Sequence, residues 1–204
     1  MIKLFGLVGT NAKESTNRKL LEYIKTTYSN KFQMEIGEIN KVPLIDYYRD
    51  RPRPMAVTEI IENIQDSDGV IIATTEYDHA PTASLMNLLA WLSQDEYPLM
   101  GKQVLLVGAS HGILGASRAQ DYLRQMLKSP SLKANVLTSD FILGRSKTAF
   151  DEKGKLISET KANELSKLLD EFIIYIDAMK DIKYKIMDLY QGKEYIWDES
   201  QVIE

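Results

Sequence analysis

The chain has 204 residues, of which 44% are hydrophobic and 26% charged, and a formal net charge of −4. This composition is typical of a soluble globular protein with one substantial core, and the lysines and arginines are spread along the chain, which excludes the basic surface that nucleic-acid binding requires. With no cysteine and only two histidines, the chain cannot form disulfides, iron–sulfur clusters, thiolate-ligated zinc or a histidine-rich metal site, so any redox chemistry requires a bound organic cofactor.

The first ten residues, MIKLFGLVGT, carry one lysine and a short apolar run. They predict a first strand and not a signal peptide, because the long apolar core and the small-residue cleavage site of a signal peptide are absent. No stretch of the sequence reaches the roughly 18 uninterrupted apolar residues that a membrane-spanning helix needs. We therefore expect a cytoplasmic protein.

Apolar runs of strand length alternate with longer segments whose apolar residues recur at helical spacing. The predicted strands cover residues 2–8, 34–39, 69–74, 103–109 and 134–143. The predicted helices cover residues 16–28, 55–65, 82–93, 116–128 and 159–179. The third and fourth strands are apolar at nearly every position, which is typical of strands covered by helices on both faces. Residues 1–180 are thus predicted to form one α/β domain, a doubly wound three-layer sandwich with a five-stranded parallel sheet.

Two segments fall outside this alternation. The loop 46–54, DYYRDRPRP, contains three arginines and two prolines, and is either a proline-stiffened solvated loop or a rim that meets an anionic cosubstrate. The tail 181–204 contains three of the tyrosines and one of the two tryptophans, an aromatic content that is unusual for a disordered end. We expect it to be a C-terminal extension that packs on the domain or on a partner subunit.

The loops after the first, third and fourth strands meet at one edge of such a sheet, where ligands bind. The first, GTNAKESTN (9–17), leads into a helix and carries three hydroxyl and two amide side chains. Free N–H groups at a helix N-terminus attract anions, so this loop predicts a phosphate site, although Ser15, Thr16 and Asn17 also suit plain helix capping. Neither G-x-G-x-x-G nor a P-loop is present, which disfavours a dinucleotide as the fixed cofactor.

The other two loops are TEYDHAP (75–81) and GASHGILGASRAQ (108–120). Both combine backbone amides with small or aromatic residues, a surface that suits a planar heterocycle. One phosphate site and one flat-ring site together predict a bound mononucleotide.

The segment GASHG (108–112) also matches the G-x-S-x-G nucleophile elbow of α/β-hydrolases. In that class an acid and then a histidine follow the nucleophile, whereas no histidine follows His111 in this chain. His111 itself adjoins Ser110 and is poorly placed to take its proton. We therefore interpret the segment as backbone that lies against a flat cofactor, with His111 at its rim.

The three loops resemble the motifs of the NADPH-dependent FMN reductase family, which includes azo-dye, quinone and chromate reductases. The family pattern is G-S-x-R-x-x-S-x-N, then P-E-Y-N followed by N-x-x-x-W, then G-A-S-x-G followed by G-x-x-R-A-Q. This chain matches it at Gly9, Ser15 and Asn17, at Glu76, Tyr77, Asn87 and Trp91, and at Gly108, Ala109, Ser110, Gly112, Gly115, Arg118, Ala119 and Gln120. The resemblance extends over residues 9–175 and includes AFDEKGKL (149–156).

The chain departs from the family pattern at four positions. Thr10 stands in place of the serine, and Ala12 stands where the family has its phosphate-binding arginine. Thr75 replaces the proline and Asp78 the asparagine of the second motif.

The resemblance implies a flavodoxin-like fold and an FMN-dependent NAD(P)H oxidoreductase. NADPH or NADH would reduce the bound FMN and leave, and an acceptor such as a quinone, an azo compound or free flavin would then take the electrons, without a dedicated acid or base from the protein. The implied FMN-binding residues are Gly9, Thr10, Asn11, Ser15, Thr16 and Asn17 at the phosphate, and Glu76, Tyr77, Asp78, His79, Ser110, His111 and Gly112 around the ring. The resemblance and the aromatic tail also imply a homodimer or a tetramer.

Two other classes compete with this interpretation. One is an FMN-binding electron carrier without nicotinamide turnover, and the other is a cofactor-free interaction protein on an inherited fold. Arg49, Arg51 and Arg53 would support the reductase if they bind the phosphate of NADPH.

Overall fold

The computed structural model describes residues 1–46, 52–94 and 96–189, with the side chains of 181–189 excepted. Its strands are β1 (Ile2–Gly9), β2 (Phe32–Glu38), β3 (Gly69–Thr74), β4 (Gln103–Ala109), β5 (Asn135–Val136) and β6 (Phe141–Leu143). They form one sheet in the order β2-β1-β3-β4-β5, with β6 also beside β4, and each pair of neighbours is parallel. The predicted doubly wound parallel sheet is confirmed.

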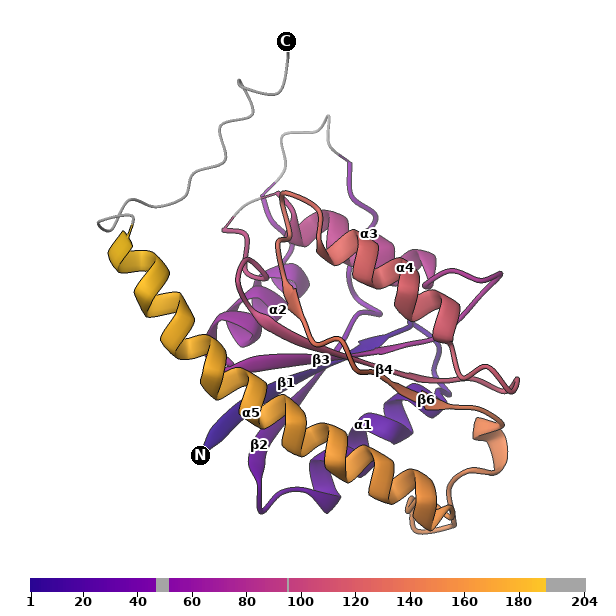
Figure 1. Ribbon diagram of the computed structural model, residues 1–204. Helices are drawn as coiled ribbons and strands as arrows, with labels where there is room; N and C mark the ends of the chain where they lie inside the picture. The colour runs from indigo at the N-terminus through magenta and orange to yellow at the C-terminus, as the bar shows by residue number, and fades with distance from the viewer. Residues whose placement is uncertain (47–51, 95, 190–204) are drawn as a thin grey trace.

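Five α-helices cover the sheet, at nearly the predicted positions. They are α1 (Thr16–Thr27), α2 (Met55–Asp66), α3 (Ala83–Leu92), α4 (Ser117–Leu127) and α5 (Glu159–Leu189), and a 3-10 turn, η1 (Ser146–Thr148), follows β6. Helices α1 and α5 lie on one face of the sheet and α2, α3 and α4 on the other (Figure 1). This gives the three-layer sandwich.

The core explains why the central strands are apolar at every position. On β3, Ile71 packs in the cluster that includes Leu20 of α1 and Phe172 of α5. The next residue, Ile72, packs in the opposite cluster with the apolar residues of α2, α3 and α4. Because successive side chains of a strand point to opposite faces, a strand between two helical layers must be apolar throughout.

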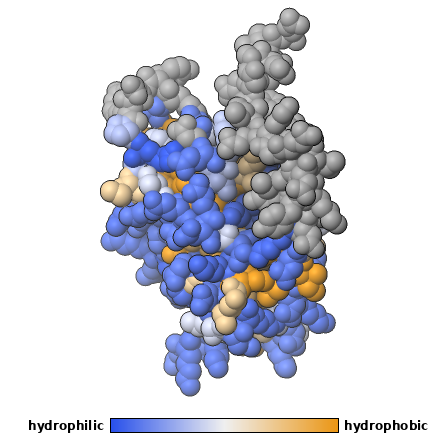
Figure 2. All heavy atoms as spheres, turned by 90° about the vertical axis from the view of Figure 1, so that its left-hand side faces the viewer, coloured by the Kyte–Doolittle hydropathy of each residue, from blue (hydrophilic) through white to orange (hydrophobic). Residues whose placement is uncertain are grey.

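Helix α5 runs past residue 180, the boundary that the sequence suggested between domain and extension. Near that point the ammonium of Lys180 lies 2.8 Å from a carboxylate oxygen of Asp68, just before β3. Outside the grey atoms, the face of the molecule seen in Figure 2 is mainly hydrophilic, with its largest apolar patch at the lower right and smaller apolar areas elsewhere. Among the described helices, none is long and apolar enough to cross a membrane.

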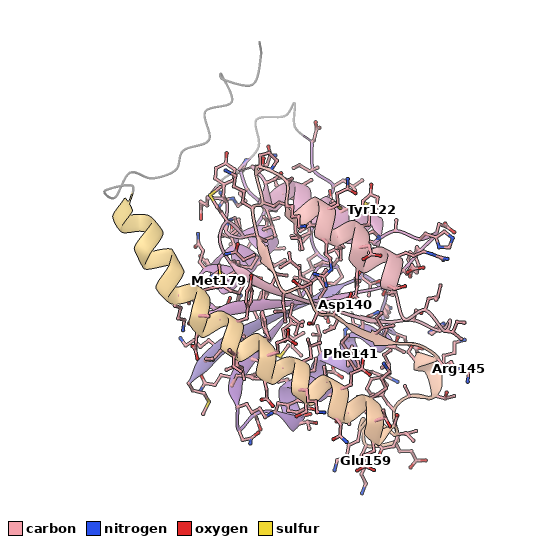
Figure 3. The ribbon with its side chains drawn as sticks, in the orientation of Figure 1. Tyr122, Asp140, Phe141, Arg145, Glu159 and Met179 are labelled. Carbon is pink, nitrogen blue, oxygen red and sulfur yellow. The ribbon has the colours of Figure 1, made fainter. Side chains whose placement is uncertain are left out.

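The predicted strand 134–143 is interrupted. Val136 pairs with Val104 and Phe141 with Val107, so two residues of β4 face four residues, 137–140, on the edge. Arg124 of α4 holds this bulge, because its guanidinium donates to the carbonyl oxygen of Leu137 and lies 3.4 Å from Asp140. Figure 3 shows Asp140 and Phe141 on the edge of the sheet between α4 and α5. Such long-range contacts are not visible in a local sequence pattern.

Candidate functional site

The strand order reverses between β1 and β3, and a cavity of about 500 Å³ lies at the carboxyl ends of β1, β3 and β4. Its volume is in the range of small-molecule sites. The three predicted loops line it with Thr10, Ala12, Glu14, Ser15 and Thr16, with Thr75, Glu76 and Tyr77, and with Ala109, Ser110, His111, Gly112, Ile113 and Leu114. The structure therefore brings together most of the predicted site residues; Gly9, Asn11, Asn17, Asp78 and His79 are outside this lining.

The first loop presents free backbone donors at the N-terminus of α1. Ser15 caps the helix, because its hydroxyl accepts hydrogen bonds from the N–H groups of Asn17 and Arg18 at 3.2 and 3.3 Å. The N–H groups of residues 13–16 donate no hydrogen bond within the described part of the chain. These donors lie at the positive end of the helix dipole, which is the usual arrangement of an anion site.

Asn17 joins the three loops from below the cavity. Its side chain is buried, its amide nitrogen donates to the Thr75 hydroxyl at 2.8 Å and to the carbonyl oxygen of Ala109 at 2.9 Å, and its amide oxygen accepts from the N–H of Ala109 at 2.8 Å. The carboxamide is thus engaged by the protein itself. Asn17 fixes the relative positions of the loops that surround the cavity.

Gly9 and Thr82 hold the first loop (9–17) against the third loop, which is the segment 75–81 after β3. The Thr82 hydroxyl caps α3 through the N–H of Leu85 at 3.1 Å and donates to the carbonyl oxygen of Gly9 at 2.8 Å. A Cβ atom on Gly9 would lie 2.6 Å from the carbonyl oxygen of Ala73. Glycine is therefore needed for the close approach of β1 and β3 at this end.

The third loop is a tight turn. Tyr77 and Ala80 exchange two backbone hydrogen bonds, and the central residues Asp78 and His79 have φ angles of +47° and +68°. Both central side chains are exposed at the tip of the turn, whereas the ring of Tyr77, which is 57% exposed, lines the cavity. Residues with positive φ at both central positions are typical of hairpin turns of type I′.

Glu76 connects this turn to α4. One oxygen of its carboxylate accepts from the N–H of Ala119 at 3.3 Å, in the first turn of α4. Ala116, the N-cap residue of α4, supplies no side-chain hydrogen bond. Glu76 therefore takes the capping role from another loop, and the helix N-terminus partly offsets its negative charge.

Arg118 extends the rim of the site. Its guanidinium nitrogen Nη1 lies 2.8 Å from Nδ1 of His79. Nδ1 of His79 also lies 3.5 Å from a carboxylate oxygen of Glu76, and a guanidinium can only donate in its contact with the imidazole. The sequence argument left Arg118 outside the site, but it supports the third loop.

The fourth loop, which is the segment 108–120 after β4, is held against the segment after β6. The N–H of Ser146 donates to the carbonyl oxygen of Ser110 at 2.9 Å and the N–H of Arg145 to that of Gly112 at 2.8 Å. In Figure 3, Arg145 marks this segment beyond β6. Gly115 has a φ of +57°, and a Cβ atom there would lie 2.2 Å from the side chain of Ile142. The loop therefore has one backbone path, which only glycine permits at this point.

The surroundings of Ser110 do not form a nucleophile elbow. Its hydroxyl donates a hydrogen bond to the carbonyl oxygen of Gly112 at 3.4 Å. Helix α4 begins only at Ser117, whereas the elbow serine lies on a sharp turn directly between strand and helix. Among the described residues, no histidine is hydrogen-bonded to Ser110.

Sequence reasoning missed Ser146. This residue is 1% exposed, and its hydroxyl donates to the Thr16 hydroxyl oxygen at 2.9 Å. Because Thr16 accepts this bond, its own proton is free to donate into the cavity, which Thr16 lines. Ser146 follows the carboxyl end of the last strand, at the same edge of the sheet as the other three loops, and this position is the signal that could have identified it.

The N-x-x-x-W motif anchors the loop after β2. The carbonyl oxygen of Pro43 accepts from the amide of Asn87 at 2.9 Å and from the indole N–H of Trp91 at 2.8 Å. The Asn87 amide oxygen in turn accepts from the N–H of Ile45 at 2.9 Å. Neither Asn87 nor Trp91 lines the cavity.

Of the three loop arginines, Arg49 and Arg51 lie outside the described residues. A guanidinium nitrogen of Arg53 lies 2.6 Å from a carboxylate oxygen of Glu96. Hydrogen bonds from Arg53 and then from Gln65 lower the pKa of Glu96 below its ordinary value.

The sequence of this chain matches one family of known proteins. Residues 2–148 match the profile of the NADPH-dependent FMN reductases. The chain is 42% identical over 192 residues to the NADH:(hydroxy)cinnamate reductase subunit CrdA of Vibrio ruber, covering 94% of this chain and 95% of that protein. It is 32% identical over 183 residues to the NADH-dependent flavin reductase subunit 2 of Lactobacillus johnsonii, covering 86% and 98%. It is also 32% identical over 154 residues to a quinone reductase of Escherichia coli, covering 70% and 81%.

Among solved structures, the flavoenzyme NAD(P)H:(acceptor) oxidoreductase FerB from Paracoccus denitrificans superposes with a TM-score of 0.77 at 22% identity, over 88% of this chain and 99% of that one. The chain also superposes on flavodoxin 1 from Bacillus cereus with a TM-score of 0.54 at 14% identity, over 84% of this chain and 97% of that one, which confirms the flavodoxin-like architecture. The profile match covers β1 to η1, and with them all the loops that line the cavity. The chain therefore belongs to the NADPH-dependent FMN reductase family and is an FMN-dependent NAD(P)H oxidoreductase.

Proposed function

We propose that FMN binds in the cavity at the carboxyl ends of β1, β3 and β4, with its phosphate on the first loop. The observation that carries the proposal is the row of unbonded N–H groups from residues 13–16 at the N-terminus of α1. The hydroxyls of Thr10, Ser15 and Thr16 and the amide of Asn11 add polar groups around the phosphate.

The flavin ring lies between the third and fourth loops. Tyr77 offers an aromatic surface on one side, and Ser110, His111 and Gly112 offer backbone on the other. A Cβ atom on Gly112 would meet nothing closer than the Ser110 hydroxyl at 4.0 Å, so this stretch of backbone is open to a ligand. Asp78 and His79 contribute at the outer rim.

The cofactor supplies the hydride and electron transfer chemistry, and the protein supplies its orientation and its electrostatic surroundings. The N–H groups of His111 and Gly112 are unbonded among the described residues and stabilise negative charge at the ring edge. The first turn of α4 binds the carboxylate of Glu76 and partly offsets its negative charge. No side chain of the cavity is required as an acid or a base.

The acceptor is a flat conjugated molecule that enters after NADPH or NADH has left. Relatives are named for quinones, flavins and (hydroxy)cinnamates, and all of these are planar. The mouth of the cavity carries the exposed apolar side chains of Tyr77, Ile113 and Leu114, which suit a planar apolar face. A quinone, an azo compound and free flavin are therefore the first acceptors to test.

Assembly and location are further parts of the proposal. The protein acts in the cytoplasm as a homodimer or tetramer, in which the predicted C-terminal extension 181–204 would pack on the domain or on the partner subunit. Of this extension, residues 181–189 continue α5, and residues 190–204 lie outside the described residues. Two of the relatives are named as subunits, which supports an assembly of several chains. If the extension packs on the partner subunit, a chain shortened after residue 180 should dissociate into monomers in a sedimentation experiment; if it packs on its own domain, the assembly should persist.

The test is a visible absorption spectrum of the purified protein mixed with FMN, desalted, and then given NADPH or NADH without oxygen. Retained FMN absorbance that bleaches on addition supports the reductase. Retained absorbance that does not bleach supports an electron carrier instead. If no FMN is retained and none binds on titration, the site proposed here is wrong.

A further inference from the structure

Arg18 lies behind the first loop, in the first turn of α1. Its guanidinium makes four hydrogen bonds, two to the carboxylate of Glu38 at the end of β2 and two to loop carbonyls. The side chain of Arg18 is 20% exposed, and it is not among the residues that line the cavity. Arg18 thus connects the end of β2 to the backbone of the first loop, on the side away from the cavity.

The positive charge of Arg18 is paired with the negative charge of the Glu38 carboxylate. Glu38 accepts from Nε at 2.5 Å and from Nη2 at 2.8 Å, a bidentate pair of favourable geometry. The hydrogen bond to Glu38 is the largest cause that raises the pKa of Arg18 above its ordinary value. The loop 9–17 itself carries one lysine and one glutamate, so its formal side-chain charge is zero. The side chains therefore leave little net charge to attract a phosphate.

The remaining two bonds fix the orientation of two peptide groups. Nη1 donates to the carbonyl oxygen of Lys13 at 2.7 Å and Nη2 to that of Ala12 at 3.1 Å. In a trans peptide the C=O and the following N–H point in opposite directions, and no cis peptide is present in the described chain. The N–H groups of Lys13 and Glu14 are consequently directed away from Arg18.

The far side of these peptides is the cavity. Ala12 and Glu14 line it, and the N–H groups of Lys13 and Glu14 have no acceptor within the described residues. Two backbone donors thus face the region in which the phosphate is proposed to lie, and an arginine on the opposite side of the chain holds them there.

We propose that Arg18 is the positioning residue of the phosphate site, which aims the N–H groups of Lys13 and Glu14 at the FMN phosphate without touching it. This inference rests on the proposed placement of FMN. It explains how the chain binds phosphate although alanine occupies position 12, where the family pattern has an arginine. The cation acts through backbone geometry, and the donors belong to the loop.

The experiment compares FMN with riboflavin, which lacks the phosphate, by quenching of flavin fluorescence on titration with the protein. Arg18→Met keeps much of the length of the side chain and removes every donor. It should raise the Kd for FMN about tenfold or more, since charge-assisted hydrogen bonds lose their geometry, and leave the Kd for riboflavin unchanged within about twofold. Arg18→Lys keeps the charge without the two-pronged donor geometry, so it should also weaken FMN binding.

Glu38→Gln separates positioning from direct attraction. If Arg18 attracted the phosphate by its charge, removal of the neighbouring negative charge would tighten FMN binding. If Arg18 positions the loop, loss of the bidentate partner releases the guanidinium and weakens FMN binding relative to riboflavin. Tighter FMN binding by Glu38→Gln would overturn the proposal, as would an unchanged FMN preference in both Arg18 variants.

Arg124→Met is the matched control, because Arg124 also joins a backbone carbonyl to a carboxylate, Leu137 and Asp140, away from the cavity. It should lower the melting temperature and leave the preference for FMN intact. If Arg18→Met fails to fold, the Kd values of Arg18→Lys and Glu38→Gln for FMN and riboflavin still test whether Arg18 positions the loop. A wild-type protein that binds FMN and riboflavin equally would instead refute the placement of the phosphate.

Discussion

The two ends of the cavity are built differently. At the α1 end, Asn17, Thr82 and Ser146 are buried, and their side chains are hydrogen-bonded to other loops. At the mouth, Tyr77 and Ile113 are 57% and 71% exposed. A rigid polar end suits a phosphate that stays bound, and an open apolar end suits two substrates that enter in turn. Substitutions at the first end should therefore affect folding and cofactor retention, and substitutions at the second should affect turnover.

The largest expected effect is that of Asn17→Ala. The change removes three hydrogen bonds of a buried side chain and leaves the N–H and C=O of Ala109 without their partner, so the free energy of unfolding should fall by about 3 kcal/mol. Urea unfolding measures this loss, and the Kd for FMN should rise with it. Asn135→Ala is the control, since it removes one bond, to the carbonyl oxygen of Gly101, and should cost about 1 kcal/mol. Equal losses in the two variants would contradict the joining role of Asn17.

Gly115→Ala should have the next largest effect. The new Cβ would collide with Ile142, so the fourth loop must shift, and we expect a loss of about 2 kcal/mol in unfolding free energy together with weaker flavin binding. Gly154 also has a positive φ, of +77°, but nothing lies within 4 Å of a Cβ built there. Gly154→Ala should therefore cost only the backbone penalty of about 1 kcal/mol. Unchanged riboflavin binding by Gly115→Ala would show that the loop does not hold the ring.

Ser146→Ala tests the rigid end without a collision. Loss of its bond to Thr16 frees the Thr16 hydroxyl to turn away, so the Kd for FMN should rise about fivefold while that for riboflavin stays constant. In a Thr16→Val background the same change should have no further effect on FMN binding. Ser67→Ala is the control, because the hydroxyl of the buried Ser67 donates to the carbonyl oxygen of Ile64 at the opposite edge of the sheet, away from the cavity.

The smallest effect on stability is expected at the mouth. Tyr77→Ser alters an exposed side chain, so the unfolding free energy should change by no more than about 0.5 kcal/mol, while KM for a quinone acceptor should rise severalfold. Tyr122, which is 48% exposed on α4 and outside the cavity lining, provides the control Tyr122→Ser with unchanged KM. A fall of more than about 0.5 kcal/mol in the unfolding free energy of Tyr77→Ser, with an unchanged KM for the quinone, would reverse the contrast between the two ends.

The sequence pattern was sufficient for the layers of the fold, because alternation of buried strands and amphipathic helices is a local property. It also located the three loops, since the carboxyl ends of parallel strands lie at one edge of the sheet. The interruption of the edge strand depends on Arg124, which reaches a carbonyl 13 positions along the chain. No local pattern contains that contact.

The roles of individual site residues were harder to predict. Asn17 and Glu76 were predicted as cofactor-binding residues, and the sequence did not show that their side chains also bind the backbone of Ala109 and Ala119. Arg18 and Ser146 were missed because each depends on a partner in another element, Glu38 of β2 for Arg18 and Thr16 of α1 for Ser146. Residue type and order reveal which loops meet, whereas hydrogen bonds across the sheet decide what each side chain does there.

The most direct test of the central claim is the ratio of the Kd values for riboflavin and FMN in the wild-type protein, measured by fluorescence quenching. A phosphate bound by the N–H groups at the start of α1 predicts that FMN binds at least about tenfold more tightly than riboflavin. Equal affinities would show that the phosphate lies elsewhere and would contradict the account of the two ends of the cavity.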